Sequence, residues 1–122
     1  MASSLTKERP KLEAFENKFA DRTYTIEIRY PEFTSVCPKT GLPDFGEIII
    51  KYIPDKFCVE LKTLKLYLHS YRNDGIFYEH VVNKVMDDFV ACCDPLEIEV
   101  IGNFNPRGGI TTTVRASHKK NK

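Results

Sequence analysis

A cysteine in a proline- and glycine-rich segment is the first residue that could carry chemistry. Cys37 lies in SVCPKTGLPDFG, seven residues before Asp44. Catalytic groups concentrate in loops held by a rigid scaffold. A free thiol has a pKa near ~8.5 and needs help to become a thiolate, which the nearby Lys39 could give. A carboxyl group folded back beside such a nucleophile suits general-acid catalysis. The alternative is a loop cysteine without function beside a turn-forming aspartate.

Three further groups could bind a ligand. Lys62 and Lys65 are spaced to share one helical face and would present two ammonium groups to an anion. Glu79 could accept N–H groups from a guanine-like base through charge-assisted hydrogen bonds. Arg107, in FNPRGG, could bind a phosphate through two parallel N–H bonds. The alternatives are a solvated helix face, a glutamate that favours the helix dipole, and an exposed hairpin arginine.

The sequence contains no known metal or nucleotide motif. Its four cysteines include no Cys-x-x-Cys, and its three histidines show no H-E-x-x-H spacing. We therefore expect no metal site. Cys58, Cys92 and Cys93 are expected to be small buried hydrophobic residues, because a reducing compartment disfavours disulfides. No G-x-G-x-x-G or Walker string occurs.

Length and charge limit the classes of function. The chain has 122 residues, with 18 basic and 17 acidic side chains, which argues against a dedicated nucleic-acid-binding protein. It shows neither a run of ~20 apolar residues nor a signal-peptide core, so we expect a cytoplasmic protein without a membrane partner. One domain of this size has no room for a two-halved Rossmann fold and a catalytic domain. A large ligand must therefore bind on a small core or between subunits.

The hydrophobic periodicity predicts the elements that position these residues. We expect a polar leader over 1–22, a folded domain over 23–117 and a solvated basic tail over 118–122. Within the domain, proline and glycine predict a loop over 31–46 and a turn over 105–109. The predicted strands are 23–30, 47–53, 96–104 and 110–117, and the predicted helices are 60–71 and 76–93. The order ββ-αα-ββ predicts an α+β fold, with an antiparallel sheet and both helices on one face.

Taken together and in this order, the motifs resemble a known enzyme family. CPKTGLPD, ELKTLKLY, FYE and FNPRGG resemble the short, single-domain NADPH-dependent 7-cyano-7-deazaguanine reductases, the nitrile reductases of queuosine biosynthesis. The resemblance runs from about residue 23 to residue 115. It implies the tunnelling fold, ring-like homo-oligomers and active sites at subunit interfaces.

The resemblance also implies a mechanism. Cys37 would add to the nitrile carbon to form a covalent thioimide, and Asp44 would donate a proton to the nitrogen. NADPH would deliver a hydride to the thioimide carbon. Release of the thiol would leave an imine, which a second NADPH would reduce to the aminomethyl product.

The binding residues follow from the same resemblance. The residues implied for the substrate are Val59, Glu60, Leu61, Tyr78 and Glu79. Those implied for NADPH are Lys62, Lys65, Tyr67 and Arg107. Tyr78 stands where the family often has histidine, which puts a proton relay at this position in doubt. Leu61 and Thr63 stand where small residues are common.

Three other readings compete with the reductase. An amidinotransferase family acting on the nitrile base within tRNA resembles this scaffold, but it lacks the lysine-containing motif. Lys62, Lys65 and Tyr67 are all present here, which favours the reductase acting on the free base, without direct nucleic-acid contact. A binding module without catalysis is disfavoured because Cys37 and Asp44 occur together with the cofactor motif. The zinc-dependent GTP cyclohydrolase type is disfavoured because its cysteine–histidine cluster is missing from the sequence.

Overall fold

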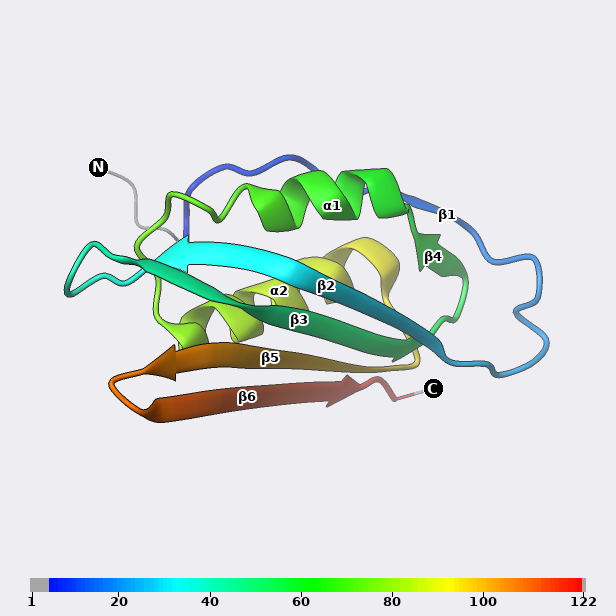
Figure 1. Ribbon diagram of the computed structural model, residues 1–122. Coiled ribbons are helices and arrows are strands. Elements are labelled where there is room, and N and C mark those ends of the chain that lie inside the picture. Colours follow the sequence, from blue (N-terminus) through cyan, green and yellow to red (C-terminus); the bar gives the residue numbers. More distant parts are fainter. Residues whose placement is uncertain (1–4, 122) are drawn as a thin grey trace.

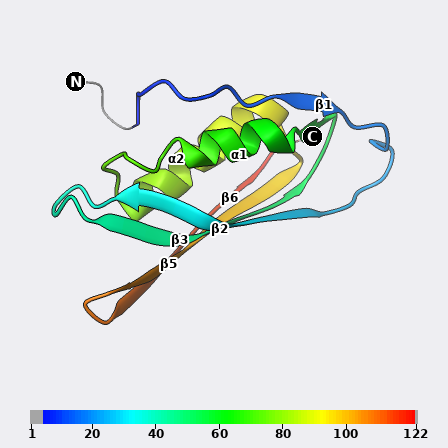
Figure 2. The same cartoon turned by 45° about the horizontal axis from the view of Figure 1, so that its top comes forward.

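The computed structural model describes residues 5–121 and has two layers, a four-stranded antiparallel sheet and two helices that cover one of its faces (Figures 1 and 2). The elements are β1 (Ala14–Glu16), β2 (Ile26–Val36), β3 (Pro43–Ile53), β4 (Phe57–Val59), α1 (Leu61–His69), α2 (Tyr78–Cys93), β5 (Glu97–Arg107) and β6 (Ile110–Lys119). The sheet order is β2-β3-β5-β6, and β1 pairs with β4. The predicted α+β class and the ββ-αα-ββ order of the main elements are confirmed.

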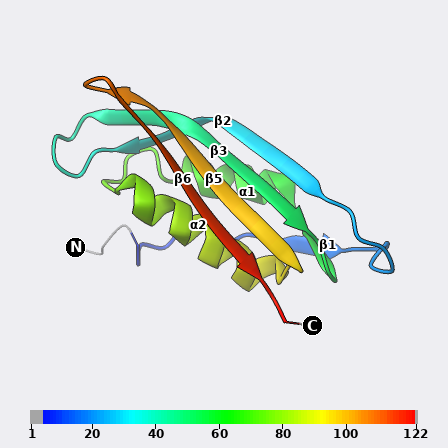
Figure 3. The same cartoon turned by 90° about the horizontal axis from the view of Figure 1, so that it is seen from below.

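The core lies between the helices and the sheet. Helix α2 packs along β5 and β6 (Figure 3). Its predicted apolar face includes Val82, Val85 and Phe89, which are fully buried. The sheet contributes Ile50 and Val100 from alternate positions of β3 and β5. Burial of each such side chain contributes about 1.5–3 kcal/mol, so this layer stabilises the packing of the helices on the sheet.

Helix α1 begins where the sequence predicts it. Glu60 precedes its first turn and accepts hydrogen bonds from the backbone N–H groups of Lys62, at 2.8 Å, and Thr63, at 2.9 Å. These bonds satisfy two of the N–H groups that a helix start leaves without partners. Leu64 and Leu68 then face the core, one turn apart.

The prediction of an irregular loop over 31–46 is wrong. Strand β2 continues through Pro31 to Val36, and β3 already begins at Pro43. The register gains one residue on β2 between Tyr30 and Phe33, which makes a bulge. Prolines are accommodated at bulges and edge strands because a ladder hydrogen bond is already missing there. Only residues 37–42 form the hairpin loop.

The predicted turn over 105–109 is also too long. Strand β5 runs through Pro106 to Arg107, with a register shift after Phe104. Gly108 and Gly109 have φ values of 56° and 84° and make the two-residue turn to β6. A turn with positive φ at both positions matches the twist of a hairpin. Arg107 therefore belongs to a strand end and not to a loose loop.

The two ends of the chain pack on the domain where the structure describes them. Residues 1–4 and 122 lie outside the described residues. Within the predicted leader, Leu12 is buried in the core and Arg9 forms an ion pair with Asp74. The predicted tail begins too early, because His118 and Lys119 belong to strand β6, although their side chains are exposed as expected. Strand β6 reaches Lys119, and the Lys120 Nζ lies 2.6 Å from Asp55 Oδ2.

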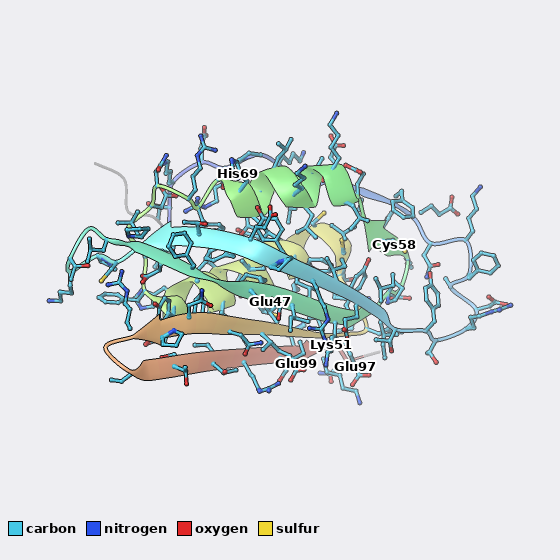
Figure 4. The ribbon with its side chains drawn as sticks, in the orientation of Figure 1. Glu47, Lys51, Cys58, His69, Glu97 and Glu99 are labelled. Carbon is cyan, nitrogen blue, oxygen red and sulfur yellow. The ribbon has the colours of Figure 1, made fainter. Side chains whose placement is uncertain are left out.

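The open face of the sheet is mostly charged. Figure 4 shows Glu47, Lys51, Glu97 and Glu99 on this face, away from the helices. Lys51 Nζ lies 3.7 Å from a carboxylate oxygen of Glu27 on the neighbouring strand. Such alternation of polar and buried positions is typical of a sheet with one covered face. Among the described residues, no helix is long and apolar enough to cross a membrane.

Candidate functional site

Four segments meet at one end of the sheet, on the left in Figure 1. They are the hairpin loop 37–42, the start of β3, the first turn of α2 and the end of β5. The Val36 N–H donates to the Asp74 carbonyl at 2.9 Å, and the Ile76 N–H donates to the Val36 carbonyl at 3.1 Å. These bonds fix the segment before α2 beside the hairpin. The fold thereby brings Cys37, Asp44, Tyr78 and Arg107 together.

Asp44 is a buried carboxyl group with two donors on one oxygen. It pairs with Ser35 in the β2–β3 register, and only 5% of its side chain is exposed. The Tyr78 hydroxyl donates to its Oδ1 at 2.8 Å, and the Arg107 Nε lies 2.6 Å from the same atom. Charge-assisted bonds of this kind hold a carboxyl group firmly in one orientation.

Cys37 is half-buried at the start of the loop. The Thr40 hydroxyl hydrogen-bonds its sulfur, and the backbone N–H groups of Thr40 and Lys39 add two further donors. These bonds hold the pKa of the Cys37 thiol below its usual value, although partial desolvation and the charge of Asp44 oppose them. Lys39 thus contributes its backbone N–H, where we had considered its ammonium group.

Thr40 and Phe104 are two site residues that our interpretation of the sequence missed. Thr40 stands three residues after Cys37 in a turn, where a hydroxyl group can bond back to a neighbouring residue. Phe104 continues the alternating pattern of β5, and its ring lies parallel to that of Tyr78, with centroids 3.9 Å apart. Neither residue belongs to a type that by itself predicts catalysis. The only signals in the sequence are the position of Thr40 three residues after Cys37 and the place of Phe104 in the alternating pattern of β5.

Tyr78 is a hydrogen-bond donor at neutral pH. Burial, followed by its hydrogen bond to Asp44, raises the pKa of Tyr78 to about 12. The phenol therefore stays protonated while it holds Asp44. Glu79, the next residue, is exposed on the first turn of α2 and so lies at the same end of the molecule. A carboxylate in the first turn is favoured by the helix dipole.

The other predicted substrate residues lie at the opposite end, on the right in Figure 1. β3 carries the chain from Asp44 to Ile53, about 30 Å at the usual rise of a strand. Val59 is buried there, Leu61 is exposed, and the Glu60 carboxylate caps α1. The hydrogen bonds of Glu60 to backbone N–H groups hold its pKa below the usual value. One chain does not bring these three residues to Cys37.

Three of the four predicted cofactor residues lie on α1 and not at the Cys37 end, and Arg107 is the exception. Lys62 and Lys65 are exposed on α1, and this pair of ammonium groups fits an anion such as a phosphate group of NADPH. Tyr67 is 2% exposed, and its hydroxyl bonds the Tyr71 hydroxyl and the Asp88 carboxylate. Burial raises its pKa. Tyr67 fits a structural role in this chain better than direct contact with a cofactor.

Comparisons with known proteins identify the family of this chain. The family model described as QueF-like protein matches residues 43–122. The chain is 60% identical to the NADPH-dependent 7-cyano-7-deazaguanine reductase of Chloroherpeton thalassium (strain ATCC 35110 / GB-78), over 91% of this chain and 96% of that protein. It is 57% identical to the reductase of the same name from Chlorobaculum tepidum (strain ATCC 49652 / DSM 12025 / NBRC 103806 / TLS), over 91% and 95%.

A solved structure extends the comparison to the fold. The crystal structure of the archaeosine synthase QueF-Like in the apo form has a TM-score of 0.68. The match covers 78% of this chain and 91% of that chain, at 23% sequence identity. This likeness confirms the predicted tunnelling fold. Since the family model covers more than half of the chain and relatives of 60% identity cover most of it, the chain belongs to the family of NADPH-dependent 7-cyano-7-deazaguanine reductases.

Proposed function

We propose that this chain reduces the nitrile of 7-cyano-7-deazaguanine to an aminomethyl group, in the synthesis of queuosine. The observation that carries the proposal is the pairing of a hydrogen-bonded thiol, Cys37, with a buried carboxyl group, Asp44, at one end of the sheet. A thiolate converts a nitrile into a C=N group that accepts a hydride more readily. The donors around Cys37 favour the thiolate that this addition needs.

The addition step assigns one role to each of the two residues. The Cys37 sulfur forms a bond to the nitrile carbon, one π bond of the nitrile breaks, and its electron pair passes to the nitrogen. The protonated form of Asp44 transfers its proton to that nitrogen, which gives the neutral thioimide. Because Tyr78 and Arg107 both donate to Oδ1, Oδ2 is the oxygen suited to carry the proton.

NADPH, when bound, supplies the hydride for each reduction. The contribution of this chain is to bind its phosphate groups, and Lys62 and Lys65 are the exposed cations in the predicted motif. Glu79, exposed at the Cys37 end, would accept the N–H groups of the base. Glu60 would accept further N–H groups, because an ionised carboxylate has about four acceptor positions and its cap uses two.

Within one chain, Cys37 and Glu60 lie at opposite ends of the sheet. This separation favours a site shared between two copies of the chain. The Cys37 end of one copy would meet the β4–α1 end of the next, and repetition of this contact would close a ring-like homo-oligomer. Large apolar side chains are exposed at both ends, which is typical of surfaces that are covered by a partner. They are Leu42, Phe45 and Ile110 at the Cys37 end, and Phe15, Phe57 and Leu61 at the other.

The direct test is to mix the purified protein with 7-cyano-7-deazaguanine and NADPH. We expect loss of the nicotinamide absorbance, and an adduct of enzyme and substrate by mass spectrometry when NADPH is left out. Cys37→Ala should abolish both. Turnover that persists in Cys37→Ala would exclude the thioimide. An adduct without any turnover would instead favour the amidinotransferase.

A further inference from the structure

The side chain of Arg107 connects three groups of the hairpin that carries the candidate catalytic residues. Its Nε lies 2.6 Å from Asp44 Oδ1, its Nη2 donates to the Pro43 carbonyl at 2.9 Å, and its Nη1 donates to Thr40 Oγ1 at 3.4 Å. A guanidinium group is planar and holds its donors in a fixed fork. These contacts therefore set the position of the hairpin relative to the end of β5.

Thr40 connects Arg107 to the sulfur of Cys37 through hydrogen bonds. Its Oγ1 accepts a hydrogen bond from the Leu42 N–H at 3.2 Å and another from Arg107. A hydroxyl group has two acceptor positions and one donor hydrogen. With both acceptor positions used, the single O–H is directed to Cys37, the remaining partner of the hydroxyl.

We propose that Arg107 and Thr40 are positioning residues, which together hold the Cys37 sulfur and the Asp44 carboxyl group in place for addition to the nitrile. The proposal rests on the function proposed above and goes beyond it. It also reassigns Arg107, which we had predicted to bind a cofactor phosphate. If the guanidinium turned away to bind a phosphate, it would leave a carboxyl group with a 5% exposed side chain without its cation, which is costly.

The first test measures Cys37 without substrate or cofactor. The rate of alkylation by iodoacetamide is followed against pH, using mass spectrometry to read modification at Cys37. Thr40→Val removes the donor, so we expect its alkylation midpoint to move up by about one pH unit, a tenfold loss of thiolate at a given pH below the midpoint. Thr40→Ser should keep the wild-type midpoint. Thr111→Val, on the exposed part of β6, is the matched control.

Other ionisable groups near Cys37 remain unchanged in the Thr40 variants. The charged or titratable side chains at this end of the molecule include Lys39 in the hairpin loop, Asp44 on β3, Tyr78 and Glu79 on α2, and Arg107 on β5. A shift in Thr40→Val that is absent in Thr40→Ser would therefore report the lost hydroxyl. An unchanged midpoint in Thr40→Val would overturn the role of Thr40.

The second test separates positioning from cofactor binding. For Arg107→Gln we expect adduct formation without NADPH to slow at least about tenfold and kcat to fall with it, while KM for NADPH stays within about twofold. Arg115→Gln on β6 is the control. An unchanged rate of adduct formation with a raised KM for NADPH would overturn the proposal and restore the cofactor role. If the wild-type protein formed no adduct, the proposed function would fail. The alkylation profiles of Thr40→Val and Arg107→Gln would still decide whether these residues position Cys37.

Discussion

The Tyr78 hydroxyl donates a 2.8 Å hydrogen bond to Asp44 Oδ1, while the Tyr78 ring lies parallel to that of Phe104. Phe104 is buried on β5, so it fixes the ring, and the ring fixes the direction of the hydroxyl. The family that the sequence resembles often has histidine at this position. A phenol with a pKa of about 12 keeps its proton across the physiological range. In this chain the residue therefore holds the carboxyl group and does not titrate.

We predict that Tyr78→Phe slows adduct formation by about tenfold to a hundredfold. The change removes the hydrogen bond to Asp44 Oδ1 and keeps the stacked ring, and leaving a buried polar group without such a partner costs about 1–3 kcal/mol. Tyr78→His should add a group that titrates near pH ~6.5, and so a new limb in the pH–rate profile. Both are measured by quenched mass spectrometry across pH. Equal rates for Tyr78→Phe and the wild-type protein would show that the bond to Asp44 does not serve the reaction.

We predict that changing Lys62 and Lys65 to Ala raises KM for NADPH about tenfold or more and spares adduct formation. Each ammonium group contributes to the binding of an anionic ligand. Neither takes part in the thiol chemistry of Cys37, which lies at the other end of the molecule. The measurement is steady-state kinetics with varied NADPH, beside adduct formation without it. Lys119→Ala, an exposed lysine of β6, serves as the control. Unaltered dependence on NADPH would show that the cofactor binds elsewhere.

We predict that two inactive variants restore activity in each other. If Cys37 of one copy meets Glu60 of the next, mixed oligomers of Cys37→Ala and Glu60→Ala contain some sites with both residues intact. Random mixing of equal amounts should recover about a quarter of the wild-type activity. Each variant is dissociated, mixed and reassembled, and either variant reassembled alone is the control. No recovery, with mixed oligomers shown by native mass spectrometry, would contradict a site to which one copy contributes Cys37 and the next contributes Glu60.

The shared site also predicts that assembly is needed for activity. Phe57→Glu on β4 and Ile110→Glu on β6 each place a charge on an apolar side chain that is exposed at one of the two ends. Either change should yield folded monomers that form no adduct, although Cys37 is intact. Light scattering after size exclusion measures the mass. Leu66→Glu, in the middle of α1, is the control. A monomer with full activity would contradict the shared site.

Asp74 should contribute stability that depends on pH. Desolvation favours its neutral form, but hydrogen bonds from Lys7 and Arg9 outweigh it and lower the pKa of Asp74. The Arg9 Nη1 lies 2.6 Å from Asp74 Oδ2, and both side chains are about 95% buried. A lowered pKa contributes stability above the unfolded value near ~3.9, and this contribution is lost as the pH falls through the folded value.

We therefore predict that Asp74→Asn lowers the free energy of unfolding by about 3 kcal/mol at pH 7, because Arg9 loses its carboxylate inside the protein. The difference from the wild-type protein should shrink below pH ~4. Urea unfolding at pH 7 and at pH 3 measures both values, and Asp87→Asn on α2 is the control. A difference that is equal at the two pH values would argue against the ionised pair.

The sequence by itself was sufficient to predict the class of fold and the closeness of Cys37 and Asp44. The spacing of Val82, Val85 and Phe89 predicts the buried face of α2, because a helix repeats every 3.6 residues wherever it lies. The approach of Asp44 to Cys37 was also accessible, since the proline- and glycine-rich turn between them can fold the carboxyl group back toward the sulfur. These relationships depend on neighbours in the chain, which local rules describe.

Only the tertiary structure decided the rest. Pro31 stays within β2 because a bulge against β3 accommodates it, and nothing local encodes that register. Arg107 contacts Asp44 and Thr40 across more than sixty residues of sequence, so its partners depend on which strand ends meet. The distance between the Cys37 and Glu60 ends follows from the length and direction of β3. The sequence states which chemical group stands at each position of the chain. Strand pairing and packing determine which other groups each of them contacts.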